Sequence, residues 1–220
     1  MGKLKSVQEA VQMIPDGATI LINGFYQQGA PEDIIDEILA QKKKNLTLMN
    51  NDAGTATKGL GKLIYAGLVK KLICSWCGLN PLLPELVEQG KIELELNPQG
   101  TFVERIRAGG YGLGGILTPT GLGTIIEEKG WGKRVHLGGR DLLYHEPLRA
   151  DVCLLEAYEA DWLGNLIFRR TQRCFGPIMA TAADLVIASV VTPIQPIGAL
   201  EPDHIMVPGQ LVDVLVQQRR

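Results

Sequence analysis

Short apolar runs alternate with stretches of helical spacing along most of the chain. Runs that are rich in β-branched residues and bounded by Gly, Asn or Asp predict buried strands, and apolar residues repeating every three to four positions predict amphipathic helices. This alternation predicts an α/β fold with an open, largely parallel sheet and helices on both of its faces. The predicted strands span 19–22, 46–49, 69–74, 91–96, 151–155, 185–190 and 211–216, and the predicted helices lie near 6–14, 31–43, 59–65, 81–89 and 177–183. Within 98–110, a loop leads into a further predicted helix that carries Phe102, Val103 and Ile106 and is closed by Gly109 and Gly110.

Two stretches depart from this alternation. Gly138 and Gly139 separate the short runs 134–137 and 141–144, a composition that predicts an antiparallel hairpin added to the sheet. From 109 to 123, seven of fifteen residues are Gly, which we interpret as too dense for regular structure and as backbone packed against another surface. No internal repeat or linker is evident, so 1–220 is predicted to be a single domain.

Composition narrows the classes of partner. The chain has 220 residues, is 45% hydrophobic and carries a formal net charge of -2. Such a balance gives no general attraction to nucleic acid or to an anionic membrane, so we expect a small-molecule or protein partner. The sequence shows neither a secretory signal nor an apolar run of roughly 18 residues, and we therefore expect a cytoplasmic protein without a membrane span.

The four cysteines do not form a convincing metal or redox site. Cys74 and Cys77 form a C-x-x-C, but Cys153, Cys174 and the three histidines are scattered, which argues against zinc. Cys74 ends a predicted strand, whereas a redox pair normally starts a helix. We expect reduced thiols and no bound metal.

The segment from Asp16 to Pro31 is the strongest candidate for a ligand site. Its predicted strand ends at Ile22, and after Asn23 a loop bracketed by Gly24 and Gly29 leads into a helix that starts near Pro31. Glycines allow the backbone to bend or approach a ligand closely, and helix starts favour anions. The loop lacks the lysine of a P-loop and the spacing of a dinucleotide fingerprint. Taken in isolation, it could equally be a structural turn.

No nucleophile stands out in the rest of the sequence. The G-x-S-x-G pattern is absent, and no cysteine lies in a recognised catalytic context. Acidic candidates exist, but their spacing singles out none as a nucleophile or base: Glu104, Glu127, Glu146 and Glu156.

The loop and several further motifs resemble a known family. Asp-Gly, an apolar run, small-Gly-Phe and Gly-x-Pro between 16 and 31 closely resemble the signature of the alpha subunit of family I coenzyme A transferases, most of all the acetate/butyrate:acetoacetate, 3-oxoacid type. The family usually has Gly-Gly-Phe where this chain has Asn23-Gly24-Phe25. The further matching motifs are Asn50-Asn51-x-Ala53-Gly54, Pro98-Gln99-Gly100-Thr101, Glu104-Arg105-Ile106-Arg107-Ala108-Gly109-Gly110, Thr118-Pro119-Thr120-Gly121-x-Gly123-Thr124, Leu148-Arg149-Ala150-Asp151, Asp161-x-x-Gly164-Asn165-Leu166 and Met179-Ala180-Thr181-Ala182-Ala183-Asp184.

The resemblance implies a ping-pong transfer of coenzyme A (CoA) between a short-chain acyl-CoA and an acid such as acetoacetate, acetate or butyrate. A glutamate carries the intermediate as a glutamyl-CoA thioester, and in two-subunit members it lies in a Ser-Glu-Asn-Gly motif of the beta subunit. This chain lacks that motif, so no catalytic residue is expected here and CoA is a substrate rather than a permanent cofactor. The expected CoA-binding residues are Asn23, Gly24, Phe25, Tyr26, Gln27, Gln28 and Gly29, and the expected acyl-pocket residues are Asn51, Gln99, Gly109 and Gly110.

Other interpretations stay open at this point. Gln99 could cap its helix, Asn50 and Asn51 could satisfy turn backbone only, and Glu104 and Arg105 are more typical of solvated surface charges. The same scaffold could serve a CoA-thioester hydrolase or ring-opening enzyme. A non-catalytic metabolite-binding domain is a further alternative.

Overall fold

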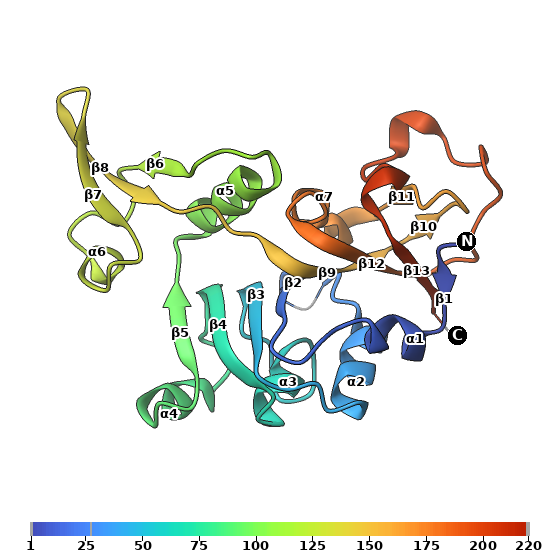
Figure 1. The fold of residues 1–220 in the computed structure, drawn as a ribbon, viewed down its shortest axis with the longest axis horizontal. Helices are drawn as coiled ribbons and strands as arrows, with labels where there is room; N and C mark the ends of the chain where they lie inside the picture. Colours follow the sequence, from blue (N-terminus) through green and yellow to red (C-terminus); the bar gives the residue numbers. More distant parts are fainter. Residues whose placement is uncertain (1, 27, 219–220) are drawn as a thin grey trace.

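An eight-stranded sheet forms the centre of the molecule (Figure 1). The computed structural model describes residues 2–26 and 28–218. Every neighbouring pair of strands is parallel, in the order β1-β13-β12-β9-β2-β3-β4-β5, which confirms the predicted open, largely parallel sheet. The strands are β1 Leu4–Lys5, β2 Thr19–Ile22, β3 Leu46–Asp52, β4 Val69–Trp76, β5 Glu93–Leu96, β9 Ala150–Ala157, β12 Ala183–Val190 and β13 Val214–Gln217.

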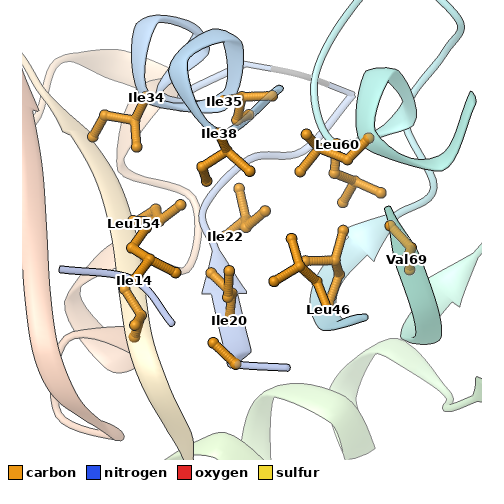
Figure 2. Close-up of a cluster of buried hydrophobic side chains, with 14 of the residues drawn as sticks. Ile14, Ile20, Ile22, Ile34, Ile35, Ile38, Leu46, Leu60, Val69 and Leu154 are labelled. Atoms are coloured by element: carbon orange, nitrogen blue, oxygen red, sulfur yellow. The ribbon is translucent and has the colours of Figure 1, made fainter. Parts of the chain in front are cut away.

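Helices cover both faces of this sheet, as the sequence predicts. Successive side chains of a strand point to opposite faces, and accordingly Ile20 and Ile22 lie in one buried apolar cluster while Leu21 lies in another. Figure 2 shows the first cluster, in which β2 packs against Ile34 and Ile38. Among the described residues, no helix is long and apolar enough to cross a bilayer. The helices of the first face are α1 Val7–Gln12, α2 Glu32–Ala40, α3 Gly61–Tyr65 and α4 Leu83–Glu88, and those of the second are α5 Gln99–Gly110 and α7 Gly176–Met179.

The predicted hairpin exists, but it belongs to a separate sheet. Strands β7 Lys133–Leu137 and β8 Arg140–His145 pair antiparallel, and β6 Ile116–Thr118 pairs with β8 on its other side. This three-stranded sheet and the short helix α6 Ile125–Glu128 project from the main body (Figure 1). The hairpin therefore extends the molecule rather than the main sheet.

The prediction that 109–123 lacks regular structure is wrong. Strand β6 lies in the middle of the glycine-rich stretch, whereas α5 ends at Gly110, as the two closing glycines predict. Gly115 and Gly121 have φ angles of +136° and +98°, which L side chains rarely adopt. The glycines thus allow the chain to turn into and out of a short strand that the composition alone conceals.

The last third contains more short elements than the sequence predicts. The helix predicted at 177–183 ends at Met179, because β12 already begins at Ala183. The strand predicted at 211–216 starts at Val214, after a turn of 3₁₀ helix. The remaining short elements are β10 Glu159–Ala160, β11 Leu166–Ile167, η1 Arg170–Arg173, η2 Pro202–His204 and η3 Gly209–Leu211.

Arg105 is buried, which corrects its interpretation as a surface charge. Its Nη1 atom donates hydrogen bonds to Glu95 Oε1 and Asn97 Oδ1, each at 2.6 Å, and its Nε atom donates to the backbone oxygen of Glu146 at 2.7 Å. The guanidinium holds the pKa of Glu95 below its usual range, although burial of the carboxyl opposes this shift. This ion pair joins α5, β5 and the base of the projecting sheet.

Candidate functional site

The loop after β2 lies where the strand order of the sheet reverses. From β2 the chain moves outward through β3, β4 and β5, and it later returns to β9 on the other side of β2. In open α/β sheets, ligands bind outside the carboxyl ends of strands at such a switch point. The N–H of Asn23 donates to the Leu154 backbone oxygen of β9 at 2.9 Å, so the loop begins in this crevice.

The loop is a tight turn held by backbone and carboxylate contacts. Phe25 and Gln28 exchange two backbone hydrogen bonds of 3.1 and 3.0 Å. Tyr26 has a φ angle of +49°, and its N–H donates to Asp52 Oδ2 at 2.8 Å. The Phe25 and Tyr26 side chains are 48% and 56% exposed, so both rings are available to a ligand. Gln27 lies outside the described residues.

Gly29 is required by a close approach of two chain segments. Its φ angle is +81°, and a Cβ at this position would lie 2.4 Å from the backbone oxygen of Gln172. A side chain here would push apart the loop and the segment 170–175, which precedes and enters α7.

Asn23 fastens these two segments together. Its side chain is fully buried, and Nδ2 donates to the backbone oxygens of Gln172 at 3.0 Å and Gly29 at 3.3 Å. Its Oδ1 atom accepts a hydrogen bond from the N–H of Phe175 at 3.2 Å. Both ends of the Asn23 amide are therefore hydrogen-bonded to the protein backbone, and Asn23 does not line the cavity.

A cavity of about 640 Å³ lies between the loop and the segment 170–175. This volume is within the range of small-molecule sites. Phe25, Tyr26 and Gln28 line it from the loop, and Gln99 lines it from the start of α5. The Nε2 atom of Gln99 donates to Asn51 Oδ1 at 3.2 Å, which brings the predicted acyl-pocket pair to the edge of the cavity. The segment 170–175 contributes Arg170, Thr171, Arg173, Cys174 and Phe175.

Buried polar residues at the carboxyl end of β3 support the loop that lines the cavity. Asn50 Nδ2 donates to the Ile22 backbone oxygen at 2.6 Å, and Asn50 Oδ1 accepts from the N–H of Asp52 at 2.9 Å. Asp52 in turn accepts from the N–H groups of Tyr26 and Gly54. Asn50 therefore does serve turn backbone, while the buried Asp52, which sequence reasoning missed, couples the loops after β2 and β3.

Gly109 and Gly110 lie at the other end of α5. With a rise of 1.5 Å per residue, they are about 16 Å along the helix from Gln99. A Cβ on Gly109 would lie 2.0 Å from the Leu148 backbone oxygen, and one on Gly110 would lie 2.0 Å from Thr181 Oγ1. The structure does not bring this pair to the cavity and instead places it in helix packing.

The cysteines are free thiols; Cys74 and Cys153 are buried, and Cys77 and Cys174 are partly exposed. Burial raises the pKa of Cys174, on the cavity wall, to about 11, and that of Cys74 to about 12, so both are protonated near neutral pH. Burial also raises the pKa of Cys153. The described part of the chain contains no group of three or more His, Cys, Asp or Glu side chains that could hold a metal ion.

The acidic candidates lie away from the cavity wall. Glu104 pairs with Arg107, Glu127 with Arg134 and Glu146 with Lys133. Glu156 accepts from the side-chain amides of Gln172 and Gln218 at 2.8 and 3.0 Å. Among the residues that the structure describes, none lines the cavity with a carboxylate.

Comparison with known proteins identifies the family. Residues 4–218 match the family described as Coenzyme A transferase. The chain belongs to this family. It is 44% identical over 214 residues to one subunit of the 3-oxoadipate CoA-transferase of Acinetobacter baylyi, covering 96% of this chain and 92% of that protein. It is also 44% identical over 203 residues to the acetoacetyl-CoA:acetate/butyrate CoA transferase alpha subunit of Clostridium acetobutylicum, covering 92% of each. The resemblance that the sequence motifs indicate is thereby confirmed.

A solved structure shows the same fold in a longer chain. An acyl-CoA transferase of Escherichia coli O157:H7, determined as a thioester complex with CoA, superposes with a TM-score of 0.88 at 24% identity. The superposition covers 99% of this chain but 47% of that one, so this chain spans about half the length of that protein. This likeness shows the fold, and the predicted fold class is confirmed.

Proposed function

We propose that this chain is the alpha subunit of a cytoplasmic, hetero-oligomeric CoA-transferase. The enzyme moves CoA from a short-chain acyl-CoA to a carboxylic acid, with the reacting glutamate supplied by a beta subunit. The observation that carries the proposal is the cavity between the loop after β2 and the segment 170–175, which has two exposed aromatic rings and the Gln99 amide on its wall but no carboxylate among the described residues. Such a cavity can hold a thioester but needs a nucleophile from elsewhere.

The proposed reaction balances without water. The partner's glutamate attacks the thioester carbonyl, CoA leaves as its thiolate, and a mixed anhydride forms. The thiolate then attacks the glutamyl carbonyl of that anhydride, which releases the donor acid and leaves a glutamyl-CoA thioester. The acceptor carboxylate repeats these two steps in reverse, so that CoA ends on the acceptor and the glutamate is restored.

Gln99 is suited to stabilise the oxyanion of each tetrahedral intermediate. A glutamine amide carries two N–H donors, and one of them is used by Asn51 Oδ1. The second remains for a ligand in the cavity that Gln99 lines. One well-placed donor to an oxyanion typically contributes about 3 kcal/mol of transition-state stabilisation.

In this proposal the loop after β2 positions the thioester and takes no covalent part in the reaction. Asn23 and Asp52 fix its backbone from behind, and the thiol of Cys174 is held protonated. We therefore assign the predicted CoA contacts to the backbone of 24–29 and the rings of Phe25 and Tyr26, with Asn23 as a support. Exclusion of water from the site in the assembled enzyme would protect the anhydride and the thioester from hydrolysis.

Reconstitution tests this function. The purified chain, the purified beta subunit and their mixture would each be assayed for transfer of CoA from a short-chain acyl-CoA to acetoacetate or acetate. Transfer by the mixture alone supports the proposal. Transfer by this chain alone contradicts it, and release of free CoA without an acceptor would indicate a hydrolase instead. A stable monomer that binds a small acid and never assembles would indicate a metabolite-binding domain.

A further inference from the structure

The cavity wall carries two arginines that the reaction chemistry leaves unused. Arg170 and Arg173 both line the cavity, on the 3₁₀ turn η1. Among the described residues, neither forms an ion pair with a carboxylate. The Arg173 guanidinium donates a hydrogen bond to Met206 Sδ at 3.9 Å. The cavity wall is therefore locally positive, although the chain as a whole has a net charge of -2.

The neighbouring Arg169 behaves differently. Its guanidinium lies over the ring of Tyr158, 5.0 Å from the centroid, and Nη1 donates to the Tyr158 hydroxyl at 3.1 Å. Arg169 is therefore occupied within the protein and does not line the cavity.

The backbone that carries the two cavity arginines is held in an unusual conformation. Arg170 and Cys174 have φ angles of +55° and +39°, which non-glycine residues rarely adopt. The Asn23 side chain holds this segment by hydrogen bonds to two backbone groups: the oxygen of Gln172, which lies between Arg170 and Cys174, and the N–H of Phe175, which follows Cys174. Strained, over-determined backbone of this kind clusters at ligand sites, because it presents side chains in a fixed position.

We infer that Arg170 and Arg173 bind a second carboxylate on the acyl substrate, so that this enzyme prefers dicarboxylic acids. The inference rests on the proposed function, in which the thioester carbonyl lies by Gln99. An anion that reaches the arginines within the same cavity then belongs to the acyl group, because the whole pantetheine arm separates the thioester from the phosphates of CoA. A guanidinium presents donors in a planar fork that matches a carboxylate.

The apolar part of the cavity fits the same substrate class. Phe25, Tyr26 and Phe175 line the space together with the polar groups. Aromatic walls suit the methylene groups that join the two carboxyl ends of a dicarboxylic acid, while few polar groups fix its orientation. A monocarboxylic acid of the same length would leave the arginines without a partner.

The test compares acceptors in the reconstituted two-subunit enzyme. Specificity is measured as kcat/KM for succinate and 3-oxoadipate relative to butyrate and acetoacetate, with Arg170→Gln, Arg173→Gln and the matched control Arg169→Gln. We expect the wild-type enzyme to prefer the dicarboxylates. Loss of one charged hydrogen-bonding group should lower that preference about tenfold to hundredfold in either cavity variant, chiefly through KM. Arg173→Lys should lower it less, and Arg169→Gln should leave it unchanged.

Four outcomes would overturn the inference. An equal loss for both classes of acceptor would place the arginines at CoA, and weaker assembly on size-exclusion chromatography would place them at the beta subunit. An unchanged preference would make them ordinary surface charges, and so would a wild-type enzyme that transfers CoA to both classes without preference. Absence of transfer to any acceptor would instead count against the proposed function.

Discussion

The side-chain amide of Asn23 and the backbone oxygen of Gln172 lie 3.0 Å apart although 149 residues separate them in the chain. This hydrogen bond joins the loop after β2 to the segment before α7. The two segments form opposite sides of the candidate cavity, so the site depends on this contact for its shape.

Replacing Asn23 by Ala should destabilise the protein by about 2 kcal/mol or more. The change removes hydrogen bonds to the buried Gly29 and the partly buried Gln172 and Phe175, and a fully buried backbone group left unsatisfied costs about 1–3 kcal/mol. Urea unfolding of the variant and the wild type measures the difference. A change within 0.5 kcal/mol, which is about the ordinary effect of a surface substitution, would contradict the role of Asn23 in joining the two segments.

Gly176 offers a control for the same contact. A Cβ on Gly176 would lie 3.3 Å from Asn23 Nδ2 and 3.1 Å from Phe168 Cε1, so Gly176→Ala crowds the amide. In an Asn23→Gly background that crowding is relieved. A double-mutant cycle should therefore show a coupling of about 0.5–1 kcal/mol, within the range for residues in contact. Strictly additive costs would show that the two positions do not share space.

Gly109→Ala and Gly110→Ala should destabilise the fold by about 1–3 kcal/mol, because each added Cβ would clash with a neighbouring segment at 2.0 Å. Gly100→Ala in the same helix is the matched control. Its Cβ would meet nothing within 4 Å, so it should be neutral or stabilise the helix by up to about 1 kcal/mol. Thermal unfolding of the three variants compares them. If Gly109→Ala and Gly110→Ala keep full stability and alter only acyl preference, both glycines belong to the substrate pocket instead.

The strands were the most predictable part of the fold. The strand at 19–22 is found with the predicted bounds, because Asp-Gly before it and Asn-Gly after it mark both ends of the β-branched run. The motifs also predicted the loop, Gln99 and Asn51 that meet at the cavity. Arg170 and Arg173 could not be found in this way, because their place on the wall depends on a contact across 149 residues. Arg105 differs from its prediction for a similar reason: its position on the helix is typical of a solvated charge, and its partner Glu95 lies on β5, a separate element.

The stability of the protein should fall as the pH drops below about 6.5, in part because of His145. Burial, and secondly the charge of Arg105, lower the pKa of this side chain in the folded state from 6.5. The unfolded chain therefore binds a proton that the folded chain excludes, and stability decreases as pH falls from 6.5 toward the lowered pKa. One such proton contributes a slope of up to about 1.4 kcal/mol per pH unit.

Urea unfolding at pH 7.5, 6.5 and 5.5 measures this slope. His145→Gln is the comparison, because its amide can still donate to the Trp131 backbone oxygen that His145 Nδ1 contacts at 3.0 Å. The variant should show a shallower pH dependence over this interval. Equal slopes in the two proteins would mean that other groups carry the effect.

Gln99→Ala should lower kcat of the reconstituted enzyme about 10²- to 10³-fold, the usual effect of removing one oxyanion donor. Gln41→Ala is a control, since Gln41 donates to Glu37 of α2 and to the Gln8 backbone of α1 and does not line the cavity. Steady-state kinetics of the two variants provide the measurement. A rise in KM with unchanged kcat after Gln99→Ala would show that Gln99 binds substrate and transition state equally.

The central claim is that this chain binds the thioester while a partner supplies the glutamate. Its most direct test is to incubate the two-subunit complex with acyl-CoA and no acceptor, reduce it with borohydride and locate the modified residue by peptide mass spectrometry. The account predicts one reduced glutamate on the beta subunit, formed only when this chain is present. A modified residue on this chain, or a beta subunit that is labelled equally well alone, would contradict it.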